Sequence, residues 1–144
     1  MQINGEWFLC DDGVMRPVIH GEILTGTGTW ILAPFLVDTG ADRSVFSAAI
    51  LAALQFQPRA TQEHLRGVGG IVTSVRVATQ VRFNHDARGT VTFRGECAAV
   101  TEREALDMSV LGRDITGVFA MIVDLPGDVV CLLGQRHQYI IMPR

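Results

Sequence analysis

Short apolar runs alternate with turns along most of the chain, and this pattern predicts a mainly β protein. The runs are rich in Val, Ile, Thr and Phe, and segments containing Gly or Asp separate them, which is typical of strands in antiparallel pairing. The predicted strands cover residues 16–24, 30–37, 71–83, 90–100, 119–124 and 129–133. The Gly-rich segment at 25–28 and the Pro126-Gly127 pair predict hairpin turns.

Helical signals are confined to two places. Ser47 can cap a run of Ala, Ile and Leu that continues to Leu54, and a shorter helix is predicted near residues 112–119. A chain of 144 residues, without internal repeats or a linker, is expected to form one domain over residues 1–144.

Composition and charge exclude several classes of function. The chain has 12 basic and 15 acidic residues, a net charge of -3 and 48% hydrophobic residues, so neither disorder nor nucleic-acid binding is expected. All the basic residues are arginine, which excludes mechanisms that need a lysine.

Neither metal nor cofactor binding is expected. The three cysteines and four histidines are too far apart along the chain to suggest a zinc site or a disulfide framework; they are Cys10, Cys97, Cys131, His20, His64, His85 and His137. No signal peptide and no apolar run long enough for a membrane span is recognised, so we expect a cytoplasmic protein.

The most specific chemical signal is Asp38-Thr39-Gly40, followed by Ala41 and Asp42. A carboxylate here comes directly after a predicted buried strand. Taken alone, the three residues are also typical of a turn closed by an Asx hydrogen bond. The segment resembles the active-site loop of aspartic peptidases, and the added Ala41-Asp42 is similar to the retroviral type, the retropepsins.

Two further segments follow in the order that this family has. Residues 65–71 resemble the glycine-rich tip of the retropepsin flap, a hairpin that closes over a bound peptide, and glycines give such a tip positive φ and little bulk. Residues 110–115 resemble the segment of two hydrophobic residues and a glycine that precedes a short helix. The resemblance extends from about Arg16 to Tyr139.

The resemblance implies an all-β fold: a retropepsin-like closed β-barrel of antiparallel strands with one or two short helices, in a homodimer. It also implies an aspartic endopeptidase, in which two carboxylates share one proton and activate one water. The chain has a single Asp-Thr-Gly, and Asp124 lacks the following hydroxyl residue, so the second carboxylate is expected from Asp38 of another copy.

The resemblance also implies a role for each site residue. Thr39 would lock the two loops across the dimer axis, Gly40 would leave room for the substrate backbone, and Arg113 would clamp Asp42 through two parallel bonds in a partly buried pair. The catalytic group is thus Asp38, Thr39 and Gly40, and the substrate-binding group is Ala41, Asp42, Gly67, Val68, Gly69 and Gly70. Residues 3–10 and 138–142 are candidates either for the dimer interface or for edge strands within one subunit.

Other functions fit less well. The main alternative is a catalytically silent retropepsin-like module that dimerises or binds peptides. The phosphate loop of sugar kinases is loosely similar to residues 38–44, but those enzymes need two large domains. Gly26-x-Gly28 lacks the third glycine of a dinucleotide site, and Ser44 and Ser47 lack the Gly-x-Ser-x-Gly elbow of serine hydrolases.

Overall fold

A long antiparallel hairpin precedes the segment that begins at Asp38. The computed structural model describes residues 1–56, 62–67, 70–135, 140 and 142–143. In it β3 (Met15–Leu24) and β4 (Trp30–Val37) pair antiparallel, from Val18 opposite Leu36 to Leu24 opposite Trp30. The Thr25 N–H donates to the Thr29 carbonyl at 2.7 Å and closes the turn. The predicted hairpin and its turn are therefore confirmed.

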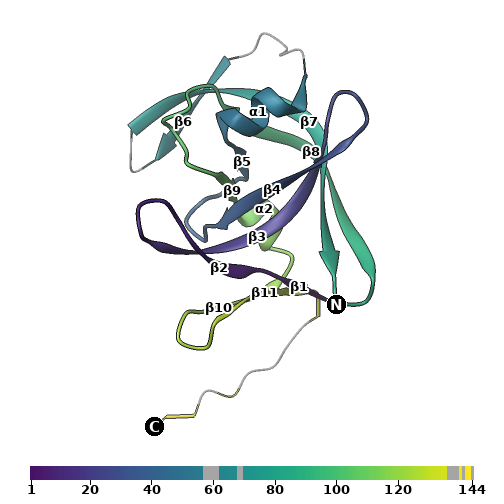
Figure 1. The fold of residues 1–144 in the computed structure, drawn as a ribbon, viewed down its shortest axis with the longest axis vertical. Coiled ribbons are helices and arrows are strands. Elements are labelled where there is room, and N and C mark those ends of the chain that lie inside the picture. Colours follow the sequence, from purple (N-terminus) through teal and green to yellow (C-terminus); the bar gives the residue numbers. More distant parts are fainter. Residues whose placement is uncertain (57–61, 68–69, 136–139, 141, 144) are drawn as a thin grey trace.

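The main sheet closes on itself. It has the order β2-β3-β4-β9-β5-β8-β7-β6, and β3 also pairs with β7 where Glu22 lies opposite Arg82, so the strands from β3 to β7 form a closed ring (Figure 1). The further strands are β2 (Glu6–Leu9), β5 (Val45–Phe46), β6 (Gln62–Gly67), β7 (Gly70–His85), β8 (Gly89–Val100) and β9 (Ser109–Leu111). This is the closed β-barrel that was predicted.

Two pairings in the barrel are parallel, which differs from the antiparallel pattern expected throughout. β9 lies parallel to β4, with Val37 opposite Leu111, and β5 lies parallel to β8. Tight turns connect antiparallel neighbours only, whereas β4 and β9 are joined through most of the barrel. The pairing of the short strands β9 and β5 is therefore determined by contacts between segments that are distant in sequence.

A second sheet has the order β1-β11-β10 and contains β1 (Gln2–Asn4), β10 (Ala120–Asp124) and β11 (Val129–Leu133). The predicted hairpin at residues 119–133 is confirmed. Within residues 3–10, β1 pairs with β11 and β2 with β3 of the same chain. Of residues 138–142, only Ile140 and Met142 lie in the described part of the chain. In this sheet β10 is an edge strand.

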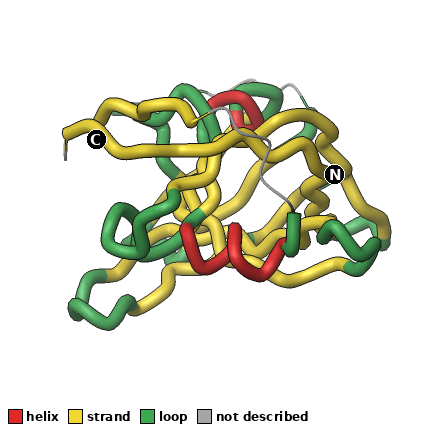
Figure 2. Tube along the Cα trace, turned by 90° about the horizontal axis from the view of Figure 1, so that it is seen from above, coloured by secondary structure: helices red, strands yellow, loops and turns green. Residues whose placement is uncertain are grey.

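Two short helices interrupt the strands (Figure 2). α1 (Ala48–Leu54) is capped by Ser47, whose Oγ accepts the Ile50 N–H, as predicted. α2 (Arg113–Thr116) is shorter than the predicted 112–119, because bonds from residue i to i−3 replace the helical pattern up to Phe119. Neither of these described helices has the length and apolar character that a membrane crossing requires.

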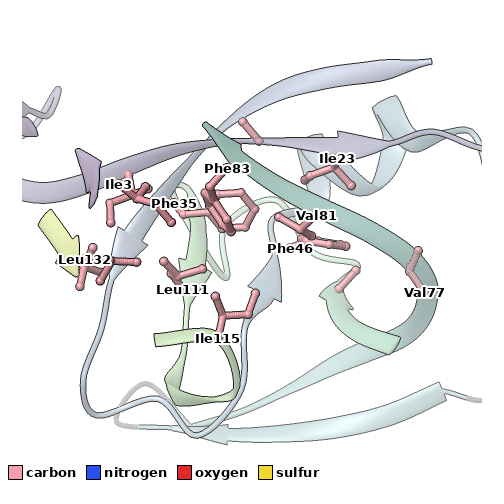
Figure 3. Packing of buried hydrophobic residues seen from close by; sticks show 14 of the residues in the cluster. Ile3, Ile23, Phe35, Phe46, Val77, Val81, Phe83, Leu111, Ile115 and Leu132 are labelled. Carbon is pink, nitrogen blue, oxygen red and sulfur yellow. The ribbon is translucent and has the colours of Figure 1, made fainter. Parts of the chain in front are cut away.

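The aromatic core fixes the register of β4. Phe35 of β4 packs edge-on against Phe46 and Phe83, with ring centroids 6.3 and 6.0 Å apart (Figure 3). Alternate residues of β4, among them Phe35 and Val37, are buried. This burial fixes the register of the strand, since a shift by one residue would expose its apolar face. Asp38 follows at the point where the buried strand ends.

Candidate active site

Asp38 lies at the end of β4, half-buried, between the strand and an exposed turn. Its backbone N–H donates to the Leu111 carbonyl of β9 at 3.2 Å, which continues the parallel β4–β9 pairing. Its Oδ1 accepts the Gly40 N–H at 2.9 Å. The Asx hydrogen bond expected of an ordinary turn is thus present. It leaves Oδ2 without a hydrogen-bond partner among the described residues.

The loop after Asp38 is fastened to the start of α2 by backbone hydrogen bonds. The Arg113 N–H donates to the Ala41 carbonyl at 2.9 Å, and the Asp114 N–H donates to the Asp42 carbonyl at 3.2 Å. The first turn of a helix has N–H groups without intrahelical partners, and here they bind the loop. The structure therefore brings residues 38–42 and Arg113 together, as the sequence predicts.

Arg113 differs in detail from the prediction. It contacts Asp42 through Nη2, but its Nη1 donates to the Thr39 carbonyl at 3.0 Å, so the guanidinium joins two points of the loop instead of clamping one carboxylate twice. The Arg113 side chain is 55% exposed and that of Asp42 is 81% exposed, so in the single chain the pair is not buried. Such an exposed pair adds little stability, and its contribution is to the shape of the loop.

Sequence reasoning missed a second, more buried network behind the loop. Ser44, 1% exposed, donates its backbone N–H and its Oγ–H to Asp114 Oδ1 at 2.9 and 2.8 Å. The Gly112 N–H in turn donates to Ser44 Oγ at 3.0 Å. Ser44 and Asp114 are 70 residues apart in sequence, so no local pattern links them. The available signal was weak: a serine shortly after Asp38-Thr39-Gly40 and an aspartate directly after Gly112-Arg113.

Gly112 is required by the close approach of two backbones. A Cβ at this position would overlap the Arg43 carbonyl group and lie 2.8 Å from the Ser44 nitrogen. We expect Gly112→Ala to lower the free energy of unfolding by about 1–3 kcal/mol, the usual effect of overpacking, as measured by urea denaturation. Gly95→Ala is the matched control, since a Cβ there meets nothing within 4 Å. Equal stability of the two variants would contradict this account of the loop.

The predicted flap is a hairpin in the structure. β6 and β7 pair up to Gly67 opposite Gly70, and Gly70 has φ +109°, a conformation that favours glycine. Val68 and Gly69, which complete the predicted tip, lie outside the described residues. Figures 1 and 3 both place this end of the hairpin on the same side of the barrel as the loop that follows β4.

Other reactive groups offer weaker sites. Burial raises the pKa of the Cys97 thiol to about 11 and also raises that of Cys131, so neither forms the thiolate that a nucleophilic cysteine needs. Asp124 Oδ1 accepts the Gly127 N–H at 3.0 Å and so closes the β10–β11 turn. No group of His, Cys, Asp and Glu side chains within the described ranges could hold a metal ion.

Comparisons with known proteins point to one family. A family model described as aspartyl protease matches residues 28–115, and the search of curated protein sequences finds no match. Among solved structures, EIAV protease in complex with the inhibitor HBY-793 is 28% identical, with a TM-score of 0.50, 71% of this chain covered and 86% of that chain. A retropepsin-like aspartic protease from Rickettsia conorii is 18% identical, with a TM-score of 0.56 and coverages of 92% and 88%. Because the family model spans more than half of its length, this retropepsin-like chain belongs to the aspartyl protease family.

Proposed function

We propose that the protein is an aspartic endopeptidase whose two catalytic carboxylates are Asp38 from each of two identical chains. The observation that carries this proposal is the position of Asp38. It ends a buried strand, its loop is tied to α2 by backbone and side-chain hydrogen bonds, and one carboxylate oxygen has no partner among the described residues. The likeness to EIAV protease, which was solved with an inhibitor bound, supports the same conclusion.

The reaction needs one ionised and one protonated carboxyl at a single water. The ionised group removes a proton from the water, whose oxygen attacks the scissile carbonyl carbon, while the protonated group donates its proton to the carbonyl oxygen, giving a tetrahedral intermediate. When this intermediate collapses, the C–N bond breaks and the carboxyl that took the proton from water passes it to the leaving nitrogen. Two like charges this close cannot both be ionised, and the paired aspartates of aspartic proteases are the best-known case of such a shared proton. Rigid loops favour this chemistry because both oxygens must stay within hydrogen-bond distance of the water.

A second copy of the chain supplies the second carboxylate in this proposal. The sequence has one Asp-Thr-Gly, and the carboxylate of Asp124 is engaged in a turn. An isologous dimer places each residue opposite its own counterpart, so Asp38 can meet Asp38 on the two-fold axis. The edge strand β10 contains the exposed Val123 and follows the exposed Val118, so its outer edge offers such a partner apolar surface and backbone groups that pair with no other described strand.

The other residues of the site take supporting roles in this proposal. Thr39 and Gly40 are exposed beside Asp38, where Thr39 can bond across the dimer axis and Gly40 leaves room for a peptide backbone. The hairpin ending at Gly67 and Gly70 closes over an extended peptide, which binds through main-chain hydrogen bonds as an added strand. Ala41 and Asp42 line the cleft beneath it.

The pH dependence of cleavage tests the proposal. We expect kcat/KM for peptides to pass through a maximum on the acidic side of neutrality. At higher pH the second carboxyl ionises and no proton donor remains, and at lower pH both carboxyls are protonated and no base remains. Initial rates with an unbiased peptide library between about pH 3 and 9 measure this profile. A rate that keeps rising to pH 9 would indicate a different base.

A further inference from the structure

We infer that the preferred peptides carry an acidic residue close to the scissile bond and that Arg43 binds it. This inference rests on the proposed function and names a substrate class for that site. Arg43 lies in the same loop as Asp38, five residues further along the chain.

The backbone around Arg43 is held by hydrogen bonds and packing against residues 112–114. The carbonyls of Ala41 and Asp42, just before it, accept the N–H groups of Arg113 and Asp114. The next residue, Ser44, is bound to Asp114 through both its N–H and its Oγ–H. The Arg43 carbonyl group itself packs on Gly112, where a side chain would not fit. With that side occupied, the Arg43 side chain is exposed on the loop.

The Arg43 guanidinium has no hydrogen-bond or ion-pair partner among the described residues. Some arginines of the chain have carboxylate partners, whereas others, such as Arg88, have none among the described residues: Arg16 contacts Asp12 at 2.6 Å, Arg82 contacts Glu22 at 2.9 Å, and Arg113 contacts Asp42. The neighbouring Asp42 is therefore already occupied by Arg113. In a chain with more acidic than basic residues, a cation in the Asp38 loop that has no partner in the described part of the chain is available to a negative group that arrives with the substrate.

The location of Arg43 suits contact with a bound peptide. The end of the β6–β7 hairpin lies on the same side of the barrel as the 38–44 loop (Figures 1 and 3). On that hairpin Leu65 and Val72 lie opposite each other, and both are half-buried. In a two-fold dimer one Arg43 flanks each half of the peptide. An acidic side chain on either half then meets a guanidinium, which binds carboxylates in a fixed geometry.

The test compares matched peptides after a library has located the scissile bond. In each pair, Asp replaces Asn at one position within about four residues of that bond. We expect wild type to cleave the better Asp peptide about fivefold faster in kcat/KM than its Asn partner, the size of effect that a partly exposed ion pair gives. Arg43→Gln should abolish the preference. Arg43→Glu should reverse it, so that a peptide with Lys at the same position is cleaved faster than its Asn partner. High salt should weaken the wild-type preference.

Arg88→Glu is the control, because Arg88 is an exposed arginine in the turn between β7 and β8, at the far end of β7 from Gly70. It should leave the preference unchanged. The inference is overturned if wild type cleaves both peptides of every pair equally, or if Arg43→Gln keeps the preference. It is also overturned if Arg43→Glu weakens dimerisation in sedimentation experiments with the preference intact, since Arg43 would then bind the partner copy. If wild type cleaves no peptide at all, the proposed function itself fails.

Discussion

Asp38→Asn is expected to reduce peptide cleavage at least about a thousandfold while leaving folding intact. The amide has nearly the same shape as the carboxyl group, and its oxygen can still accept the Gly40 N–H that Asp38 Oδ1 accepts in the structure. It can neither take a proton from water nor share one with the opposite carboxyl, so the general acid and base are lost together. The measurements are kcat/KM with a library-derived peptide and the midpoint of thermal unfolding.

Asp107→Asn is a suitable control, because Asp107 is an exposed carboxyl in the segment before β9 and belongs to neither the loop nor the hairpin. It should keep wild-type activity. Full cleavage by purified Asp38→Asn protein would exclude Asp38 as the catalytic group. Absence of cleavage by wild type, with peptide binding retained, would instead favour the silent binding module.

Mixing experiments are expected to show that a complete site needs two chains. If wild type is exchanged with a threefold excess of Asp38→Asn chains, about one dimer in sixteen retains both carboxylates. Total activity should then be about a quarter of that given by the same amount of wild type alone. Dilution should have a related effect, because mass action removes the dimer below its dissociation constant.

Subunit exchange must be measured independently, for example by energy transfer between labelled chains. With exchange complete, activity that stays proportional to the wild-type chain would mean that one chain suffices, and the two-chain mechanism would be wrong. An excess of Asp107→Asn chains in place of Asp38→Asn should add activity in proportion to its amount, which excludes a general effect of crowding or dilution.

Local patterns were enough to predict the β3–β4 hairpin, the β10–β11 hairpin and the α1 cap. In each, the signal lies within a few residues: turn glycines at 25–28, Pro126-Gly127, and Ser47 three residues before the N–H that it accepts. Such elements depend on backbone preferences and on alternating burial, which a sequence displays directly. Asp38-Thr39-Gly40 is also a run of consecutive residues, but alone it is equally typical of an Asx turn, and only the segments at 65–71 and 110–115, in the order of the family, pointed to a peptidase.

Contacts between distant segments were decided only by the tertiary structure. β9 pairs in parallel with β4 across more than seventy residues of chain, and the Ser44–Asp114 bond spans 70. A three-residue strand or a single hydroxyl group has too weak a local structural preference to determine what it pairs with. These pairings are determined when the barrel closes and brings the distant segments together. The same holds for Arg113, which joins Thr39 and Asp42 because α2 ends up beside the loop. The sequence by itself therefore determined which residue carries the candidate chemistry, and the fold determined what holds that residue in place.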